Sequence, residues 1–397
     1  MATSESSFDK RSKRYLILAV MILSFFVVMT YNYFLSTLLV EIAGTFKVSI
    51  GTASQIATVS RFVGLVIGFV LSFLAIRFKL KSVYVLGTVF FALGVLGSFF
   101  APNFLSIVLL QVLVGTGFTV VTVFTVALIG ETLPLKERGF AVSLTYVAQF
   151  IANIFVPPIS SSLVLVGTWR TVLVWFILPL SVVSIALSWI FLPSKLYSFS
   201  AKPQYKEAFK RIIINRSAIA CLACVSLLTF LFIVPTYAVT FYRMDFHQTL
   251  KTAAFYSSIS AVGGLAGALT GGTVVNRVGR KTLAMTMTLV SGLFALTFSF
   301  VPNLLVSVAL WTAGTLTLGM CATGFRSLVL EQVPGFRGSM MSVADMFRSI
   351  GFITGLAIGG LLLNIYANNF HLVMIMYGVA GIAVAPVLLL SRDPCVA

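Results

Sequence analysis

The 397-residue chain is unusually apolar: hydrophobic residues make up 59% of it and its mean hydropathy is +1.06. A typical soluble domain is roughly 45 to 50% apolar, so this composition excludes a water-soluble globular protein. The net charge is +17 although only 9% of residues are charged, and because the basic residues are scattered between apolar runs they do not form a nucleic-acid-binding face.

Twelve apolar runs follow one another, each long enough to cross the ~30 Å hydrocarbon layer as a helix of about 20 residues. Lipid offers no hydrogen-bond partners, so the spans must be helices or a closed barrel, and barrel strands would be short and alternating. We therefore predict an all-α integral membrane protein with twelve transmembrane helices. The predicted spans are 15–40, 50–76, 82–101, 104–130, 140–166, 170–192, 217–241, 251–275, 282–301, 304–329, 340–364 and 371–391.

The first run follows four basic residues, as a signal peptide would, but it is too long for one and lacks a small-residue cleavage site. We predict a retained helix whose polar cluster is Tyr31, Asn32 and Tyr33. In the run at 140–166, Gln149 and Asn153 lie one turn apart. These five residues are predicted to line a substrate pathway, with interhelical hydrogen bonding as the alternative role.

Three ionisable residues stand inside predicted spans: Arg61, Asp345 and Arg348. A charge at mid-membrane costs at least ~2.5 to 3.5 kcal/mol, so each is a functional candidate. Asp345 could pair with Arg348 one turn away, or with Arg61 in another span. A static ion pair that helps assembly is the alternative to a coupling role. Asp345 is the one acid well inside a predicted span, and therefore the candidate for proton coupling.

The basic residues also predict orientation. Most of the 27 Lys and Arg residues fall on one side of the predicted membrane, and the opposite loops hold only Lys47, Arg170, Arg243 and Lys251. By the positive-inside rule both termini are cytoplasmic. Cys221 and Cys224 have CxxC spacing but lie in an apolar run without a second CxxC or a histidine cluster, so no metal site is predicted.

The chain contains an internal repeat at an offset of 200 residues. Paired positions include Ser60 and Ser260, Gly64 and Gly264, Pro102 and Pro302, Asn103 and Asn303, and Glu131 and Glu331. Each copy holds six spans, so both copies face the same way and enclose a solute site at their interface. The predicted organisation is a tail of 1–14, a bundle of 15–192, a linker of 193–216, a bundle of 217–391 and a tail of 392–397.

The basic loop GGTVVNRVGRK at 271–281 resembles a signature of the major facilitator superfamily of secondary transporters: Gly, three residues, Asp, Arg, any residue, Gly, Arg and a basic residue. Asn276 stands in place of the usual Asp. The matching positions are Gly272, Asn276, Arg277, Gly279, Arg280 and Lys281. The resemblance implies that this loop is a latch in the transport cycle, in which Arg277 and Arg280 could pair with Glu331.

In outline the chain is closest to the drug and metabolite exporter branch of that family. The branch usually has an Arg in the fourth span, where this chain has Gln111, and a Gly-Pro signature in the fifth, of which Pro157 remains. Proton-coupled export by the branch's usual residues therefore stays open.

The sequence thus predicts a secondary active transporter of a small organic solute by alternating access, with proton-coupled efflux as the first hypothesis. The alternative is an uptake permease or uniporter for an organic anion; a non-transporting scaffold or receptor is a third reading. No enzyme activity, cofactor, metal or nucleic-acid partner is predicted. The expected partners are the solute, membrane lipid and, for coupled transport, protons. We expect a monomer in the plasma membrane.

Overall fold

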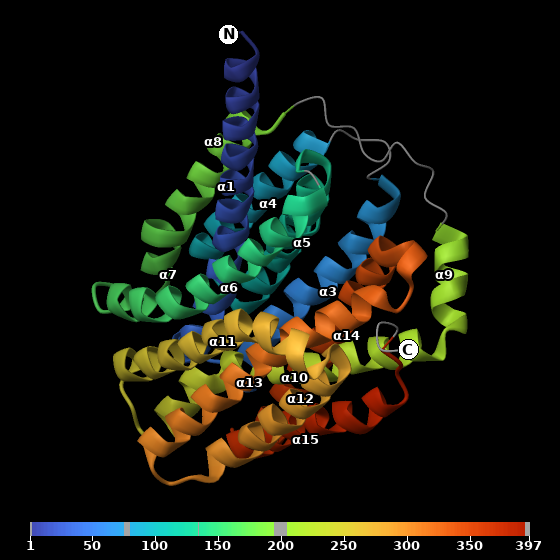
Figure 1. Ribbon diagram of the computed structural model, residues 1–397. Helices are drawn as coiled ribbons and strands as arrows, with labels where there is room; N and C mark the ends of the chain where they lie inside the picture. Colours follow the sequence, from blue (N-terminus) through green and yellow to red (C-terminus); the bar gives the residue numbers. More distant parts are fainter. Residues whose placement is uncertain (1, 75–79, 134, 194–204, 394–397) are drawn as a thin grey trace. The chain divides into compact units, whose positions relative to one another are not determined.

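The computed structural model describes residues 2–74, 80–133, 135–193 and 205–393, and these residues form helices without any strand. Figure 1 shows their arrangement. The helices are α1 (Ala2–Thr37), α2 (Leu39–Phe46), α3 (Ile50–Leu74), α4 (Leu80–Phe100), α5 (Phe104–Thr132), α6 (Leu135–Val164), α7 (Trp169–Val172), η1 (Leu173–Ile177), α8 (Leu178–Phe191), α9 (Tyr205–Ile214), α10 (Arg216–Met244), α11 (Leu250–Val278), α12 (Arg280–Thr297), η2 (Phe298–Phe300), α13 (Leu304–Glu331), η3 (Pro334–Phe336), α14 (Arg337–Ile365) and α15 (Phe370–Leu389).

Within the described ranges, twelve segments are long and apolar enough to cross a membrane. The prediction of an all-α fold with twelve spans is therefore confirmed, and the ends differ by only a few residues. The run predicted at 251–275, for example, is α11. Two helices lie outside the prediction. α1 already begins at Ala2, because residues 2–14 contain no Pro or Gly that would stop a helix, and α9 lies inside the predicted linker.

The chain divides into two compact units. Unit 1 comprises residues 1–35 and 59–202, and unit 2 comprises residues 36–58 and 203–397. The segment 36–58 packs with the second half of the chain, and the division into bundles of 15–192 and 217–391 stays a prediction. We call the contact of residues 36–58 with α10 and α14, all within unit 2, the seam.

Small residues hold the seam together. A Cβ on Gly51 would collide with the carbonyl oxygen of Gly360, so the start of α3 approaches α14 backbone to backbone. Ser49 donates to Asn364 Oδ1, whose amide in turn donates to Thr52 Oγ1 at 3.4 Å. Gln55 Nε2 donates to the Ala357 carbonyl at 3.5 Å. The seam is thus closed by polar contacts around a glycine pair.

The internal repeat is a repeat of helix contacts. In unit 1, α3 meets α5 where a Cβ on Gly115 would strike the Ser60 carbonyl and a Cβ on Gly64 would strike Thr119. In unit 2, α11 meets α13 at the corresponding positions: Thr315 Oγ1 donates to the Ser260 carbonyl at 2.5 Å, and a Cβ on Gly319 would strike the Gly264 carbonyl. The 200-residue offset therefore preserves which residues touch.

The repeated Asn also has one structural role in both copies. Asn103 is the N-cap of α5, where its side chain accepts from Ser106 N at 2.8 Å. Asn303 is the N-cap of α13, where its side chain accepts from Leu305 N at 2.9 Å. An N-cap side chain satisfies backbone donors that the helix itself leaves unpaired. The Pro-Asn echo in the sequence marks two equivalent helix starts.

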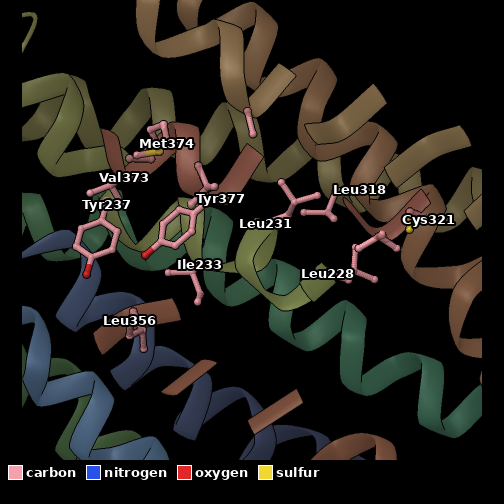
Figure 2. Close-up of a cluster of buried hydrophobic side chains, with 14 of the residues drawn as sticks. Leu228, Leu231, Ile233, Tyr237, Leu318, Cys321, Leu356, Val373, Met374 and Tyr377 are labelled. Atoms are coloured by element: carbon pink, nitrogen blue, oxygen red, sulfur yellow. The ribbon is translucent and has the colours of Figure 1, made fainter. Parts of the chain in front are cut away.

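The core of unit 2 is apolar and aromatic. Figure 2 shows α10, α13, α14 and α15 contributing side chains to one cluster. Tyr237 of α10 stacks on Tyr377 of α15 with ring centroids 6.3 Å apart, and Tyr377 donates to the Gly355 carbonyl of α14 at 3.0 Å. These contacts join α15 to α10 and α14, the two helices on which residues 36–58 pack.

The sixth span contains a local widening. A π-helical turn, η1, separates α7 from α8, and Pro179 is the second residue of α8. Proline removes a backbone donor, and its ring would crowd the carbonyl of Trp175 four residues earlier in a regular α-helix. The wider π turn relieves that crowding and allows the span to continue to Phe191.

Candidate functional site

A network of polar side chains lies inside unit 1, on α1, α3, α5 and α6. Arg61 Nη2 donates to Asn32 Oδ1 at 3.1 Å, and the guanidinium carbon lies 4.4 Å from the ring centroid of Phe118. Gln149 Nε2 donates to the Tyr33 hydroxyl at 3.4 Å. The sequence-predicted residues of three helices are therefore brought together, around a half-buried arginine.

Tyr31 belongs to a separate and more deeply buried contact. Its hydroxyl accepts from Gln111 Nε2 at 3.0 Å, and its ring packs edge-on against Phe91 at 5.9 Å. Tyr31 and Gln111 are both buried, at 3% and 0% exposure. Because this pair is enclosed by α1, α4 and α5, it fits a structural role in positioning α1. Tyr31 is thus set apart from Asn32 and Tyr33, with which the sequence grouped it.

Asn153 lies one turn beyond Gln149 on α6 and is buried. The same helix contains Pro157 and Pro158. A proline inside a helix leaves a carbonyl of the preceding turn without its usual donor, which favours a kink. Asn153 therefore lies next to the part of α6 that is least regular.

Sequence reasoning missed two residues: Gln111, which contacts Tyr31, and Phe118, which packs against Arg61. Gln111 was noted only as a departure from a family pattern, although a single amide inside an apolar run is a signal for an interhelical hydrogen bond. Phe118 gives no such signal, since phenylalanine is abundant throughout the chain. Its role depends on Arg61 lying opposite, which only the fold determines.

A charged cluster lies in unit 2, on α13 and α14. Arg348 Nη2 donates to Asp345 Oδ1 one turn away, and the two side chains are 37% and 53% exposed. Arg326 of α13 is half-buried and lies close enough to both for their charges to interact. The structure therefore contains the local pair of the two alternatives. Pairing of Asp345 with Arg61, which belongs to unit 1, stays a prediction.

Arg326 corrects the sequence analysis, which counted three charged residues inside spans. The helix α13 continues to Glu331 and carries Arg326 within the candidate span. Two arginines and one aspartate thus lie together in the halves of α13 and α14 that are nearest to their connection. The extra cation makes the cluster a positively charged site rather than a balanced ion pair.

The basic loop joins α11 to α12 through one residue. Gly279 has φ 90°, a conformation that residues with a side chain rarely adopt, so glycine is required for this turn. Arg277 is exposed in the last turn of α11, and Gly272 lies one helical turn and a half before it. The side chain of Asn276 lies outside the described part of the structure.

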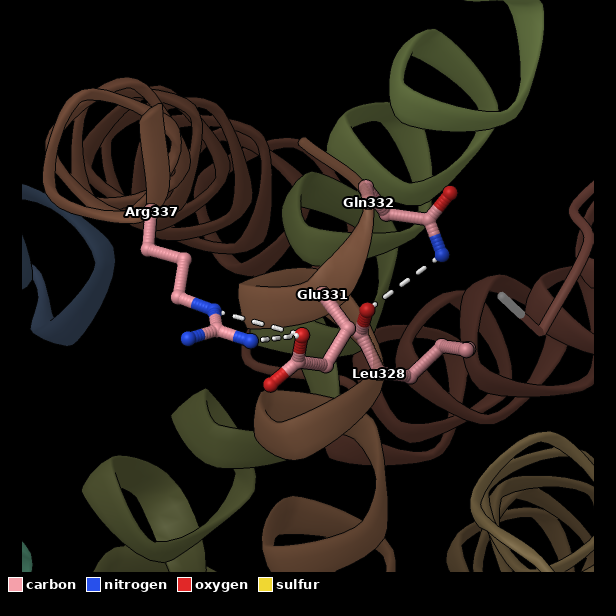
Figure 3. Close-up of polar contacts among 4 residues, drawn as sticks. All are labelled: Leu328, Glu331, Gln332 and Arg337. Atoms are coloured by element: carbon pink, nitrogen blue, oxygen red, sulfur yellow. Dashed lines mark hydrogen bonds and ion pairs between the residues drawn. The ribbon is translucent and has the colours of Figure 1, made fainter. Parts of the chain in front are cut away.

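Lys281 and Glu331 have partners that the sequence did not predict. Lys281 Nζ donates to the Ser391 carbonyl at 2.5 Å and the Leu389 carbonyl at 3.3 Å, at the end of α15. Figure 3 shows that Arg337 reaches Glu331, with Nη2 2.6 Å from Oε2. A latch of Arg277 or Arg280 with Glu331 stays a prediction. The first-half loop at 75–79 and the side chains of Glu131 and Arg138 lie outside the described residues.

The sequence matches the family model of the Major Facilitator Superfamily over residues 20–271 and again over 219–395. No curated protein matches closely enough to serve as a relative.

Three solved structures share the fold. A D-xylose-proton symporter has a TM-score of 0.79 at 16% identity, covering 96% of this chain and 98% of its own. A point mutant of the nucleoside transporter NupG has a TM-score of 0.77 at 16% identity, and the match covers 94% of this chain and 99% of its own. A bacterial homolog of the human lysosomal transporter Spinster has a TM-score of 0.73 at 12% identity, and the match covers 95% of this chain and 94% of its own. The chain is therefore a multi-pass membrane transporter, not an enzyme, and belongs to the major facilitator superfamily.

Proposed function

We propose that the protein is a secondary active transporter that binds a small organic solute at the network of Asn32, Tyr33, Arg61 and Gln149 and moves it by alternating access. The observation that carries this proposal is the position of Arg61. Its guanidinium is oriented by the Asn32 amide and the Phe118 ring, neither of which changes its charge. Amide, phenol and guanidinium groups from separate helices suit several hydrogen bonds to one solute.

Chain connectivity supports alternating access. The segment 36–58 packs in unit 2, yet it continues into α1 on one side and into the rest of α3 on the other, both in unit 1. We propose that alternating access also separates this segment from α10 and α14. The hydrogen bonds and glycine contacts of the seam can be broken and remade at modest cost.

We further propose that Asp345 carries the coupled proton. Its place inside a candidate span, its pairing with Arg348 and the nearby charge of Arg326 support this role. Net efflux is the first direction to test. The alternative is uptake or uniport of an organic anion, which the positive charge of Arg61 favours. Membership of the exporter branch, cytoplasmic termini, a monomeric state and location in the plasma membrane remain part of this proposal.

The test is solute-dependent pH change inside liposomes that contain the purified protein, with cationic, neutral and anionic compounds. Asp345→Asn should transport solute without moving protons, while Glu207→Gln, which removes an exposed acid on α9, should behave as the wild type. Proton movement that persists in Asp345→Asn would sink the coupling assignment and leave a structural ion pair.

The solute site is tested by Arg61→Gln and Gln149→Ala. We expect the KM of Arg61→Gln to rise at least about tenfold, since a hydrogen bond to a charged group is worth roughly 1.5 to 3 kcal/mol. Lys251→Gln, which removes an exposed charge in unit 2, is the matched control. An unchanged KM in both site variants would place the solute elsewhere.

A further inference from the structure

The short helix α9 is attached directly to the end of a membrane span. Only Asn215 separates α9 from α10, and the candidate span begins at Arg216. Asn215 Oδ1 accepts from Ser217 N at 3.0 Å and Ala218 N at 3.2 Å, and its amide donates to the Gln332 carbonyl at 3.0 Å. This junction is therefore fixed at the level where α10 starts and α13 ends. The last turn of α9 lies next to the start of a candidate span.

One face of α9 packs on unit 2. Ile212 is buried, at 1% exposure. Arg211 lies over the ring of Phe336 at 5.4 Å and pairs with Glu207 at 2.7 Å. Phe336 belongs to η3, immediately before α14. This face holds α9 against the ends of the neighbouring spans.

The other face carries apolar side chains that are left exposed. Phe209, Ile213 and Ile214 are 55%, 52% and 68% exposed, and Lys210 is exposed among them. Residues 209 and 213, and likewise 210 and 214, are one helical turn apart, so the four form a continuous stripe along α9. We call Phe209, Lys210, Ile213 and Ile214 the α9 stripe.

We propose that the α9 stripe lies in the membrane surface and binds anionic lipid headgroups. A helix with an apolar stripe and neighbouring cations, held parallel to the boundary, buries its apolar side chains between headgroups and acyl chains. Phe209 and Ile213 would enter that layer, while the long stem of Lys210 lets its ammonium reach lipid phosphates. Arg216, also exposed, adds a second cation at the same level.

The α9 stripe lies so close to the start of a candidate span that the membrane is a better partner for it than an acidic soluble protein. A soluble partner would satisfy Lys210 but would have to reach Ile213 and Ile214, which lie three and two residues before the start of a candidate span. The side concerned is the one that the charge distribution predicts to be cytoplasmic. The inference does not rest on the proposed solute or on proton coupling.

The test places a nitroxide spin label on the full-length protein in vesicles, at Ile213→Cys in the α9 stripe and at Glu207→Cys, which lies about 120° away from Ile213 around the helix. Both are made with Cys395→Ser; Cys221, Cys224 and Cys321 are buried and protected from labelling. We expect the ratio of oxygen to nickel-chelate accessibility to be several-fold higher at 213 than at 207. A label at 213 that is as aqueous as the one at 207 would leave the stripe to a soluble partner and overturn the proposal.

Headgroup binding is tested by comparing phosphatidylcholine vesicles with vesicles that also contain phosphatidylglycerol. The label at 213 should move deeper when the anionic lipid is present, and Lys210→Gln should abolish that shift while leaving the label immersed. Because Lys210 is exposed, this variant is expected to fold normally. Immersion that does not respond to anionic lipid would reject the headgroup contact.

Discussion

Glu41 of α2 and Arg243 of α10 form an ion pair across the seam, with Arg243 Nη1 2.7 Å from Glu41 Oε1. The side chains are only 17% and 20% exposed, and the second carboxylate oxygen of Glu41 is buried without a hydrogen-bond partner. The pair therefore combines partial burial with incomplete hydrogen bonding. Either charge alone would be partly buried without an opposite charge, which is unfavourable. Together the two side chains hold α2 against α10.

Removing one partner of this pair should destabilise the protein more than removing both. We expect Arg243→Gln to cost about 1 to 3 kcal/mol, because it leaves a buried carboxylate without its cation. Adding Glu41→Gln removes that carboxylate's charge and should recover part of the loss. Thermal unfolding in detergent measures the cycle of two single variants and one double variant. Strictly additive losses would show that the two side chains act independently.

A disulfide across the seam should arrest transport. Asn364 Nδ2 lies 3.4 Å from Thr52 Oγ1, so Thr52→Cys with Asn364→Cys places two thiols on facing helices of the seam. Oxidation should abolish solute uptake by vesicles, and a reductant should restore it, because alternating access requires the seam to open. Each single-cysteine variant under the same oxidant is the control. Full transport by the cross-linked protein would mean that the seam stays closed throughout the cycle.

The two copies of the repeated N-cap should contribute similarly. We expect Asn103→Ala and Asn303→Ala each to cost about 0.5 to 2 kcal/mol, since each leaves backbone donors at a helix start without an acceptor. Asn→Asp at the same positions preserves the acceptor and should cost less. Unfolding temperatures of the four variants give the comparison. A cost in one copy alone would show that the equivalence is geometric but not energetic.

Asp245, just past the end of α10, predicts a pH dependence of stability. Burial raises its pKa above the ordinary value of 3.8, while His371, 3.2 Å away, and His247 lower it by smaller amounts. Because the pKa is higher in the folded state, the stabilisation is present below the unfolded pKa and is lost as pH rises through the folded one. Asp245→Asn, which stays neutral, should not lose stability over that range.

Unfolding temperatures between about pH 3 and pH 7 test this sign, because they bracket the ordinary carboxyl range. His371→Gln should extend the loss to higher pH, since it removes the larger of the two opposing influences. Identical pH profiles for the wild type and Asp245→Asn would refute the role of this carboxyl group.

The twelve spans could be predicted closely because lipid imposes one rule on every span: about 20 apolar residues in a self-bonded helix. The repeat was equally readable, since Asn103 and Asn303 mark the same helix start in each copy. The short helix α9 was missed because the linker was read by its charge alone. Its spacing of Phe209, Ile212 and Ile213 is amphipathic and was available in the sequence.

Pairing within the candidate sites was harder to predict. The sequence offered Arg277 and Arg280 as partners of Glu331, whereas the contact with Arg337 depends on the turn made by η3. The contact of Arg61 with Phe118 depends likewise on how α3 crosses α5. The sequence shows which spans contain charged residues. It does not show which neighbouring helix each charged side chain contacts.

Gly279 is the whole connection between α11 and α12, and this leaves no slack between the two helices. One residue spans ~3.8 Å between consecutive Cα atoms, so neither helix can slide along its axis without pulling on the other. Lys281, at the start of α12, donates to the carbonyls of Leu389, the last residue of α15, and of Ser391 just beyond it. A conformational change at this end of unit 2 is therefore expected to move α11, α12 and the end of α15 together. The hinges for such a change have to lie elsewhere in the chain.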